Sequence, residues 1–166
     1  PNTKPAATTI AELEKKYERA AMVSLANFSF NIGATNDNLE ELKRVSKQDV
    51  AAIKVFMGSS TGNMLVDQQK TLEEIFQLDH QLITHCEDEQ TIRTNLEKAQ
   101  AQYGDDIPMS MHPLIRSEKA CYLSSSTAVK LAKKYNSQLH VFHLSTAKET
   151  ELFSNRKPLA SKRITS

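Results

Sequence analysis

Short apolar segments alternate with helical segments along the chain, and this alternation constrains the fold more than any other feature. We expect four strands, over 23–32, 50–57, 81–85 and 139–144. Apolar residues at helical spacing, several behind capping residues, predict helices over about 10–22, 37–45, 72–76, 89–103 and 118–135, with a last one opening near 145. Such an order is typical of βαβ units, in which helices cover a parallel sheet.

The length limits how much of a closed architecture the chain can form. It has 166 residues, whereas a closed (β/α)8 barrel needs roughly 200 or more. The sequence begins at Pro1 without an initiator Met and shows no closing element before Ser166. We therefore expect an α/β fold that is either a small open sheet or, as we favour, about half of a TIM-type (β/α)8 barrel. Residues 1–166 would then be one partial barrel domain of a longer chain.

Composition and missing motifs exclude several classes of protein. Apolar residues make up 39%, charged residues 25%, and the net charge is +1, which is typical of a globular domain and leaves no nucleic-acid footprint. The apolar stretches are too short to span a bilayer, and neither GxGxxG nor GxxxxGK[ST] occurs. The two cysteines, Cys86 and Cys121, are interpreted as reduced thiols, so we expect a cytoplasmic protein without nucleic-acid or membrane partners.

Lys54 is the most unusual residue among those near the expected strand ends, where α/β proteins carry their functional groups. It lies within an apolar strand, in which a charged ammonium is costly to bury. One interpretation is a lysine whose ammonium reaches water at the rim. The other is a desolvated lysine that acts as a base, a nucleophile or a modified ligand.

Two histidines, His85 and His143, lie at or near the ends of apolar strands. They are either hydrogen-bonded structural residues or metal ligands, since imidazole is the commonest neutral ligand. His140 is an odd number of residues from His143, so we expect it to face the helices. Cys86 should face away from His85, and His112 is expected in a loop above the third strand, packing there or touching substrate.

Five short motifs occur in a specific order along the chain. They cover Pro1–Pro5, Ile53–Gly58, Thr84–Glu89, His112–Arg116 and His140–Glu149. In this order and spacing the sequence resembles dihydroorotases of the amidohydrolase superfamily along nearly its whole length. The resemblance implies a (β/α)8 barrel that holds two zinc ions at the mouth formed by the carboxyl ends of its strands.

The resemblance also implies a role for four residues of this sequence. Lys54 would be carboxylated by CO2 and would bridge both metals, and the anionic carbamate would remove the cost of burying a lysine. His85 and His143 would bind one zinc, and Asn2 would bind the substrate carboxylate. The implied reaction is the reversible zinc-dependent hydrolysis of L-dihydroorotate to N-carbamoyl-L-aspartate in pyrimidine biosynthesis, in which metal activates water and polarises the carbonyl.

Two parts of the family pattern have no counterpart in this sequence. The His-x-His pair of the first barrel strand is expected before Pro1, and the aspartate of the eighth strand, both ligand and proton shuttle, after Ser166. The aspartates on loops and helix starts of other units do not fit that role: Asp67, Asp88, Asp105 and Asp106. We therefore expect no catalytic proton shuttle in this chain, and no turnover by the chain alone.

Other functions remain open at this point. The same metal set is implied for hydantoinases, dihydropyrimidinases and allantoinases, which hydrolyse related cyclic amides. A non-catalytic dihydroorotase-like scaffold, or a plain α/β domain without a site, are further alternatives. The expected partners are a small-molecule substrate and a possible second copy of the protein.

Overall fold

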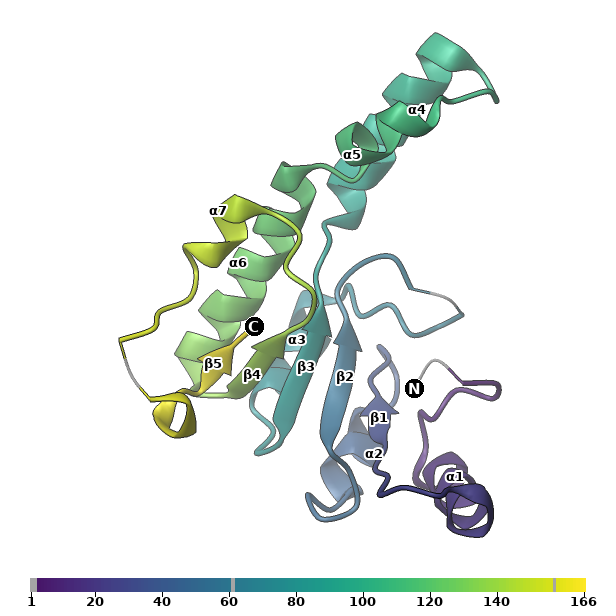
Figure 1. The fold of residues 1–166 in the computed structure, drawn as a ribbon, viewed down its shortest axis with the longest axis vertical. Helices are drawn as coiled ribbons and strands as arrows, with labels where there is room; N and C mark the ends of the chain where they lie inside the picture. Colours follow the sequence, from purple (N-terminus) through teal and green to yellow (C-terminus); the bar gives the residue numbers. More distant parts are fainter. Residues whose placement is uncertain (1–2, 61, 157) are drawn as a thin grey trace.

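A five-stranded parallel sheet forms the centre of the molecule (Figure 1). The computed structural model describes residues 3–60, 62–156 and 158–166, so Asn2 lies outside the described residues. The strands lie side by side in chain order: β1 (Asn31–Gly33), β2 (Ala52–Phe56), β3 (Gln81–His85), β4 (Gln138–Val141) and β5 (Ile164–Thr165). The α-helices are α1 (Ile10–Val23), α2 (Leu39–Arg44), α3 (Gln69–Phe76), α4 (Glu89–Tyr103), α5 (His112–Ile115), α6 (Glu118–Tyr135) and α7 (Ala147–Thr150). Two 3-10 turns, η1 (Met109–Met111) and η2 (Leu159–Ser161), complete the elements.

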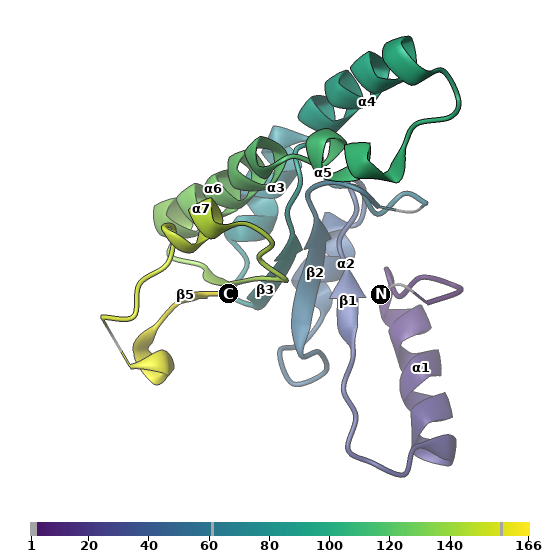
Figure 2. The same ribbon diagram turned by 45° about the horizontal axis from the view of Figure 1, so that its top comes forward.

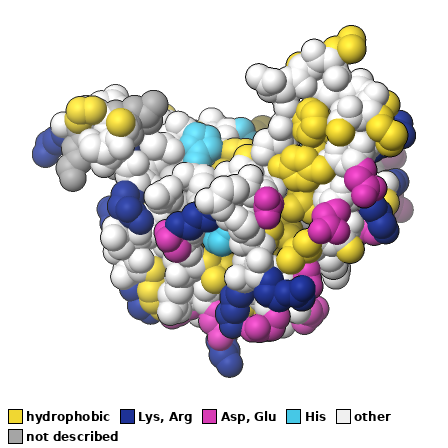
Figure 3. All heavy atoms as spheres, turned by 90° about the horizontal axis from the view of Figure 1, so that it is seen from below, with side chains coloured by type: hydrophobic (Ala, Val, Ile, Leu, Met, Phe, Trp, Pro, Cys, Tyr) yellow, Lys and Arg dark blue, Asp and Glu magenta, His cyan; other side chains and the backbone are white. Residues whose placement is uncertain are grey.

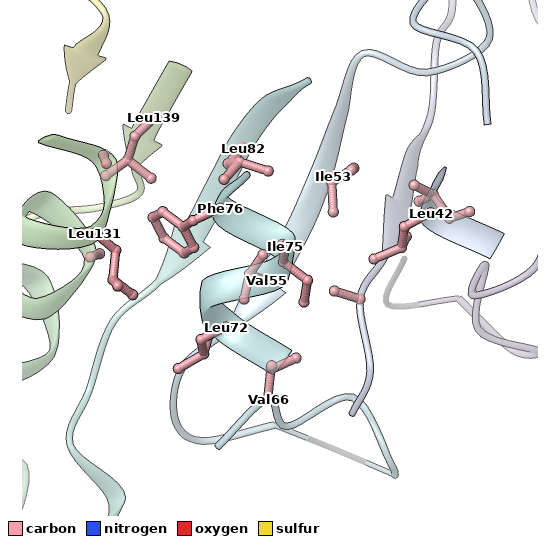
Figure 4. Close-up of a cluster of buried hydrophobic side chains, with 14 of the residues drawn as sticks. Leu42, Ile53, Val55, Val66, Leu72, Ile75, Phe76, Leu82, Leu131 and Leu139 are labelled. Carbon is pink, nitrogen blue, oxygen red and sulfur yellow. The ribbon is translucent and has the colours of Figure 1, made fainter. Parts of the chain in front are cut away.

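One face of the sheet packs against helices and forms the hydrophobic core. Strand register places one residue from each strand in a single row: Ile32, Ile53, Leu82, Leu139 and Ile164. The first four of these are fully buried, and they pack with Ile75 and Phe76 of α3 and with residues of α6 (Figure 4). We call this packed side the helix-facing core.

The next row of the register lies on the opposite face of the sheet, because side chains alternate along a strand. It contains Gly33, Lys54, Ile83, His140 and Thr165. The expectation that His140 faces the helices is therefore wrong. The alternation does not continue to His143, since β4 ends at Val141 and His143 has a positive φ of 40°. His140 instead contacts Thr165, with 2.8 Å between Nδ1 and Oγ1.

The first expected strand is much shorter than the apolar pattern predicts. Helix α1 extends to Val23, and only Asn31–Gly33 pairs in the sheet. Phe28 and Phe30 pack on Tyr17 of α1, with ring centroids 6.0 and 5.0 Å away. Because these rings pack against α1, they are partly covered without the segment forming a longer strand.

The helices that follow clear capping residues begin and end as predicted. Asp88 accepts a 2.8 Å hydrogen bond from the Thr91 amide at the start of α4, and the Ser117 hydroxyl accepts one from Ala120 at the start of α6. Two expectations near these helices are wrong. The region expected as a loop before α6 contains η1 and α5, and β5 pairs with β4 near the chain end, where no closing element is expected.

Figures 1 and 2 show α4 projecting away from the sheet with α5 beside it. In the part of the chain that the structure describes, no helix is long and apolar enough to cross a membrane.

Seen from below, hydrophobic side chains gather toward one side of the surface (Figure 3). The large exposed hydrophobic residues include Met22, Val23, Leu25 and Phe28, at the end of α1 and just after it.

Candidate metal centre

Lys54 occupies the middle of β2 and is buried, with 6% of its surface exposed. Its ammonium lies over two aromatic rings, with Nζ 4.1 Å from the ring centroid of Phe142 and 4.9 Å from that of Phe56. Burial lowers the pKa of Lys54 to about 8, because the charged form is poorly solvated there. The burial agrees with the desolvated lysine of the second interpretation, while its role as base, nucleophile or modified ligand stays a prediction.

His85 and His143 come together from neighbouring strand ends. His85 is the last residue of β3, and His143 follows β4 by two residues. Nδ1 of His85 lies 3.0 Å from Nε2 of His143, and the two ring centroids are 4.9 Å apart. His143 follows the end of β4 with a positive φ of 40°, so the regular strand conformation has ended before it.

A buried carboxylate stands on the other side of the His85 ring. Oε2 of Glu87 lies 3.0 Å from Nε2 of His85, and Arg116 donates from Nε to Oε1 at 2.8 Å and from Nη2 to Oε2. Burial by itself would raise the pKa of Glu87, but the hydrogen bonds from His85 and Arg116 outweigh it and lower the pKa to about 2. Glu87 is therefore ionised and can only accept hydrogen bonds.

These side chains border one pocket of about 530 Å³ at the carboxyl end of the sheet. His85, Glu87, Arg116 and His143 line it, and His112 of α5 lines it as well. Since α5 is short and His112 is exposed there, this histidine sits at the pocket wall rather than in the core. The pocket is large enough for a small organic substrate.

The donor set fits a divalent metal that prefers nitrogen and oxygen ligands. Two imidazole nitrogens at tetrahedral zinc, each about 2.0–2.1 Å from the metal, lie roughly 3.3 Å from each other. The 3.0 Å between Nδ1 of His85 and Nε2 of His143 is close to that spacing. Among the described residues, no group of three or more His, Cys, Asp or Glu could hold a metal ion. To hold a metal ion, the histidine pair would therefore need further ligands.

Of the predicted site residues, His85 and His143 are in direct contact. Lys54 is linked to them through shared aromatic neighbours, since Phe56 lies 6.0 Å from His85 and Phe142 lies 6.3 Å from His143, measured between ring centroids. Cys86 belongs to the helix-facing core, as predicted. The substrate-binding role given to Asn2 lies outside the described residues.

Sequence reasoning did not single out Glu87 and Arg116, whose side chains meet at the pocket. Both belong to the motifs that carry the resemblance, but no pattern joins them, because they are 29 positions apart. One signal was present: a carboxylate two residues after a candidate ligand histidine can orient that histidine through its second ring nitrogen.

The sequence is similar to curated enzymes along nearly all of its length. It is 32% identical over 167 aligned positions to a dihydroorotase of Methanosarcina mazei, covering 98% of this chain and 35% of that protein. It is 27% identical to a dihydroorotase of Methanosphaera stadtmanae and 26% identical to an allantoinase of Streptomyces avermitilis, covering 95% and 94% of this chain and 35% of each relative. No protein-family model matches the chain. The chain spans about a third of the length of these curated relatives.

Solved structures share the fold. The L-hydantoinase (dihydropyrimidinase) of Arthrobacter aurescens superposes with a TM-score of 0.83 at 24% identity, covering 92% of this chain and 34% of that one. A D-hydantoinase of a Bacillus species superposes with a TM-score of 0.68 at 26% identity, covering 86% of this chain and 32% of that one. These neighbours are TIM-barrel amidohydrolases, so the expected parallel (β/α) units of a partial barrel are confirmed. The resemblance to dihydroorotases of the amidohydrolase superfamily is likewise confirmed, as a similarity that runs along nearly the whole chain.

Proposed function

We propose that this chain is part of a longer metal-dependent cyclic amidohydrolase, and that the protein's reaction is the reversible hydrolysis of L-dihydroorotate to N-carbamoyl-L-aspartate. The observation that carries the proposal is the pair of imidazole nitrogens, His85 Nδ1 and His143 Nε2, which meet 3.0 Å apart at the pocket wall. The similarity to curated dihydroorotases supports this substrate.

The two histidines would hold one zinc ion through these facing nitrogens. A bound zinc would supply Lewis acidity, which activates water and polarises the amide carbonyl of the substrate. The residues of this chain fix where that chemistry takes place: the imidazoles lie at the strand ends, and the pocket of about 530 Å³ opens beside them.

Lys54 would contribute a ligand after reacting with CO2. The neutral amine attacks the carbon of CO2, so that an N–C bond forms, one C–O π bond opens to give a carboxylate, and the amine loses a proton to solvent. Burial favours a neutral amine at this position. The product is an anion, which two cations would neutralise inside the protein. The remaining ligands and the proton-shuttling aspartate would come from outside residues 1–166.

The test is ultraviolet-monitored hydrolysis of L-dihydroorotate by the full-length protein, with hydantoin and allantoin as alternative substrates. We expect selective turnover of dihydroorotate. Lys54→Ala should lower the rate of dihydroorotate hydrolysis by more than the roughly 10- to 100-fold that substitutions of outer-shell residues near a metal typically cost. Lys43 is exposed, so Lys43→Ala should hydrolyse dihydroorotate at the parent rate.

A related cyclic amide is the second candidate substrate, because an allantoinase is among the relatives and hydantoinases share the fold. Turnover of hydantoin or allantoin instead of dihydroorotate would favour it. No turnover of any of the three by zinc-loaded protein would contradict the enzymatic proposal and favour a scaffold.

A further inference from the structure

Glu87 and Arg116 form a buried support behind His85, on the side away from His143. Glu87 is 8% exposed, and its two oxygens are occupied by Nε2 of His85 and by the Arg116 guanidinium. The Glu87 backbone is fixed too. A Cβ placed on Gly58, in the loop after β2, would lie 2.0 Å from the Glu87 carbonyl oxygen, so the two backbones are in direct contact.

This support determines which nitrogen of His85 carries the proton. Both Glu87 oxygens accept hydrogen bonds from the Arg116 guanidinium, and a carboxylate paired in this way acts as an acceptor, so Nε2 of His85 donates to it across their 3.0 Å contact. In the neutral ring, Nδ1 then keeps its lone pair. That lone pair is the one directed toward His143, whose Nε2 is 3.0 Å away.

Arg116 determines where the Glu87 carboxylate can point. It stands at the end of α5, where its amide donates a 2.9 Å hydrogen bond to the His112 carbonyl, just before the Ser117 cap of α6. Its guanidinium contacts both carboxylate oxygens, a geometry that fixes orientation as well as charge. Held in this way, Glu87 cannot turn toward the His85–His143 pair to compete as a ligand.

We propose that Glu87 and Arg116 are positioning residues, which hold His85 in the Nε2–H tautomer and aim its Nδ1 lone pair at the metal position shared with His143. This proposal rests on the proposed function, because the Nε2–H tautomer of His85 matters only if His85 binds a metal. It goes further in assigning roles to two residues that would not themselves bind the metal.

Nitrogen NMR of the histidine rings in the metal-free full-length protein tests the tautomer directly. We expect His85, identified by the loss of its signals in His85→Gln, to carry its proton on Nε2. In Glu87→Ala this preference should be lost, with a mixture of both tautomers. A structural ion pair without a positioning role would leave the tautomer unchanged in Glu87→Ala, and that result would overturn the proposal.

Zinc affinity, measured by competition with a chromophoric chelator, provides the second readout. Glu87→Gln keeps the side-chain volume but removes the charge, and we expect zinc binding to weaken by roughly 10- to 100-fold. Arg116→Lys keeps a cation without the two-pronged contact and should show a smaller loss. The matched control is Glu40→Gln, which removes an exposed carboxylate paired with Lys43 on α2 and should bind zinc like the parent.

The two proposals fail in different ways. If the parent protein binds zinc and hydrolyses its substrate while Glu87→Gln and Arg116→Lys bind zinc within twofold of the parent, the positioning role is wrong and the function stands. If the parent neither binds zinc nor hydrolyses a cyclic amide, the proposed function fails, and the tautomer measurement still decides whether Glu87 controls His85. Circular dichroism confirms that each variant is folded.

Discussion

The two faces of the central strands differ sharply in chemistry although they alternate residue by residue. On β2, Ile53 and Val55 are fully buried in the helix-facing core, while Lys54 between them points to the other face. At the end of β3, Thr84 and His85 divide in the same way, with Thr84 buried and His85 in the pocket. The packed face thus holds the strands rigidly. The strands in turn fix the positions of the polar side chains on the other face, whose burial is costly.

The largest expected effect on stability comes from the helix-facing core. Phe76 of α3 is fully buried, so Phe76→Ala should lower the free energy of unfolding by about 3–5 kcal/mol. Urea denaturation of the full-length protein measures this change. Leu114→Ala, at a position that is 60% exposed, is the control and should change stability little. Equal losses in the two variants would contradict the assignment of the core.

A substitution on the opposite face of the sheet should affect zinc binding and hydrolysis much more than it affects stability. Lys54→Met keeps the length and most of the volume of the side chain but removes the buried ammonium. In the metal-free protein we expect the free energy of unfolding to change by no more than about 1.5 kcal/mol, because the side-chain volume is nearly kept, whereas hydrolysis and zinc binding should be lost. A fully active, zinc-binding Lys54→Met protein would show that Lys54 has no part in the site.

The two cysteines test the difference between the packed core and the pocket, because both lie close to the pocket but are buried. Burial raises the pKa of Cys86 to about 11, and it also raises the pKa of Cys121. Little thiolate is therefore present at pH 8, so we expect iodoacetamide to modify neither cysteine in the native protein and both after unfolding. Mass spectrometry detects the products. Rapid native modification of Cys86 would mean that the pocket opens through the core.

The smallest expected effect concerns a contact between the helices on the outer surface. The Glu73 carboxylate accepts hydrogen bonds from Tyr135, Gln69 and Lys134, and these lower its pKa to about 2. An unfolded glutamate titrates near 4.3, so the folded protein gains stability above that pH and loses it as the pH falls toward 2. Glu73→Gln should therefore narrow the difference in melting temperature between pH 5 and pH 3. An unchanged difference would show that the contact contributes nothing.

Much of the fold follows from local patterns in the sequence. Strand β3 and helices α4 and α6 have the predicted bounds, and β2 (Ala52–Phe56) lies within the predicted segment 50–57. The pattern fails where tertiary contacts decide. Phe28 and Phe30 pack on a helix instead of extending a strand, and the apolar Leu96 is 37% exposed on α4, which projects beyond the sheet (Figure 1).

The candidate site was only partly accessible from the sequence. Position at or just after a strand end selected His85 and His143, and a charge inside an apolar strand selected Lys54; their roles stay predictions. The faces of β4 were predicted wrongly because the positive φ of His143 breaks the alternation on which the argument depends. The contact between Glu87 and Arg116 joins distant segments of the chain, and only the folded structure brings them together.

The central claim is that Lys54, His85 and His143 form part of a metal centre. Anomalous diffraction at the zinc absorption edge, from crystals of the full-length protein grown with zinc and bicarbonate, tests it most directly. We predict an anomalous peak about 2.0–2.1 Å from both Nδ1 of His85 and Nε2 of His143, with density for a carboxylate on Nζ of Lys54. Zinc-loaded crystals without a peak at this position, and with an unmodified Lys54, would contradict the account.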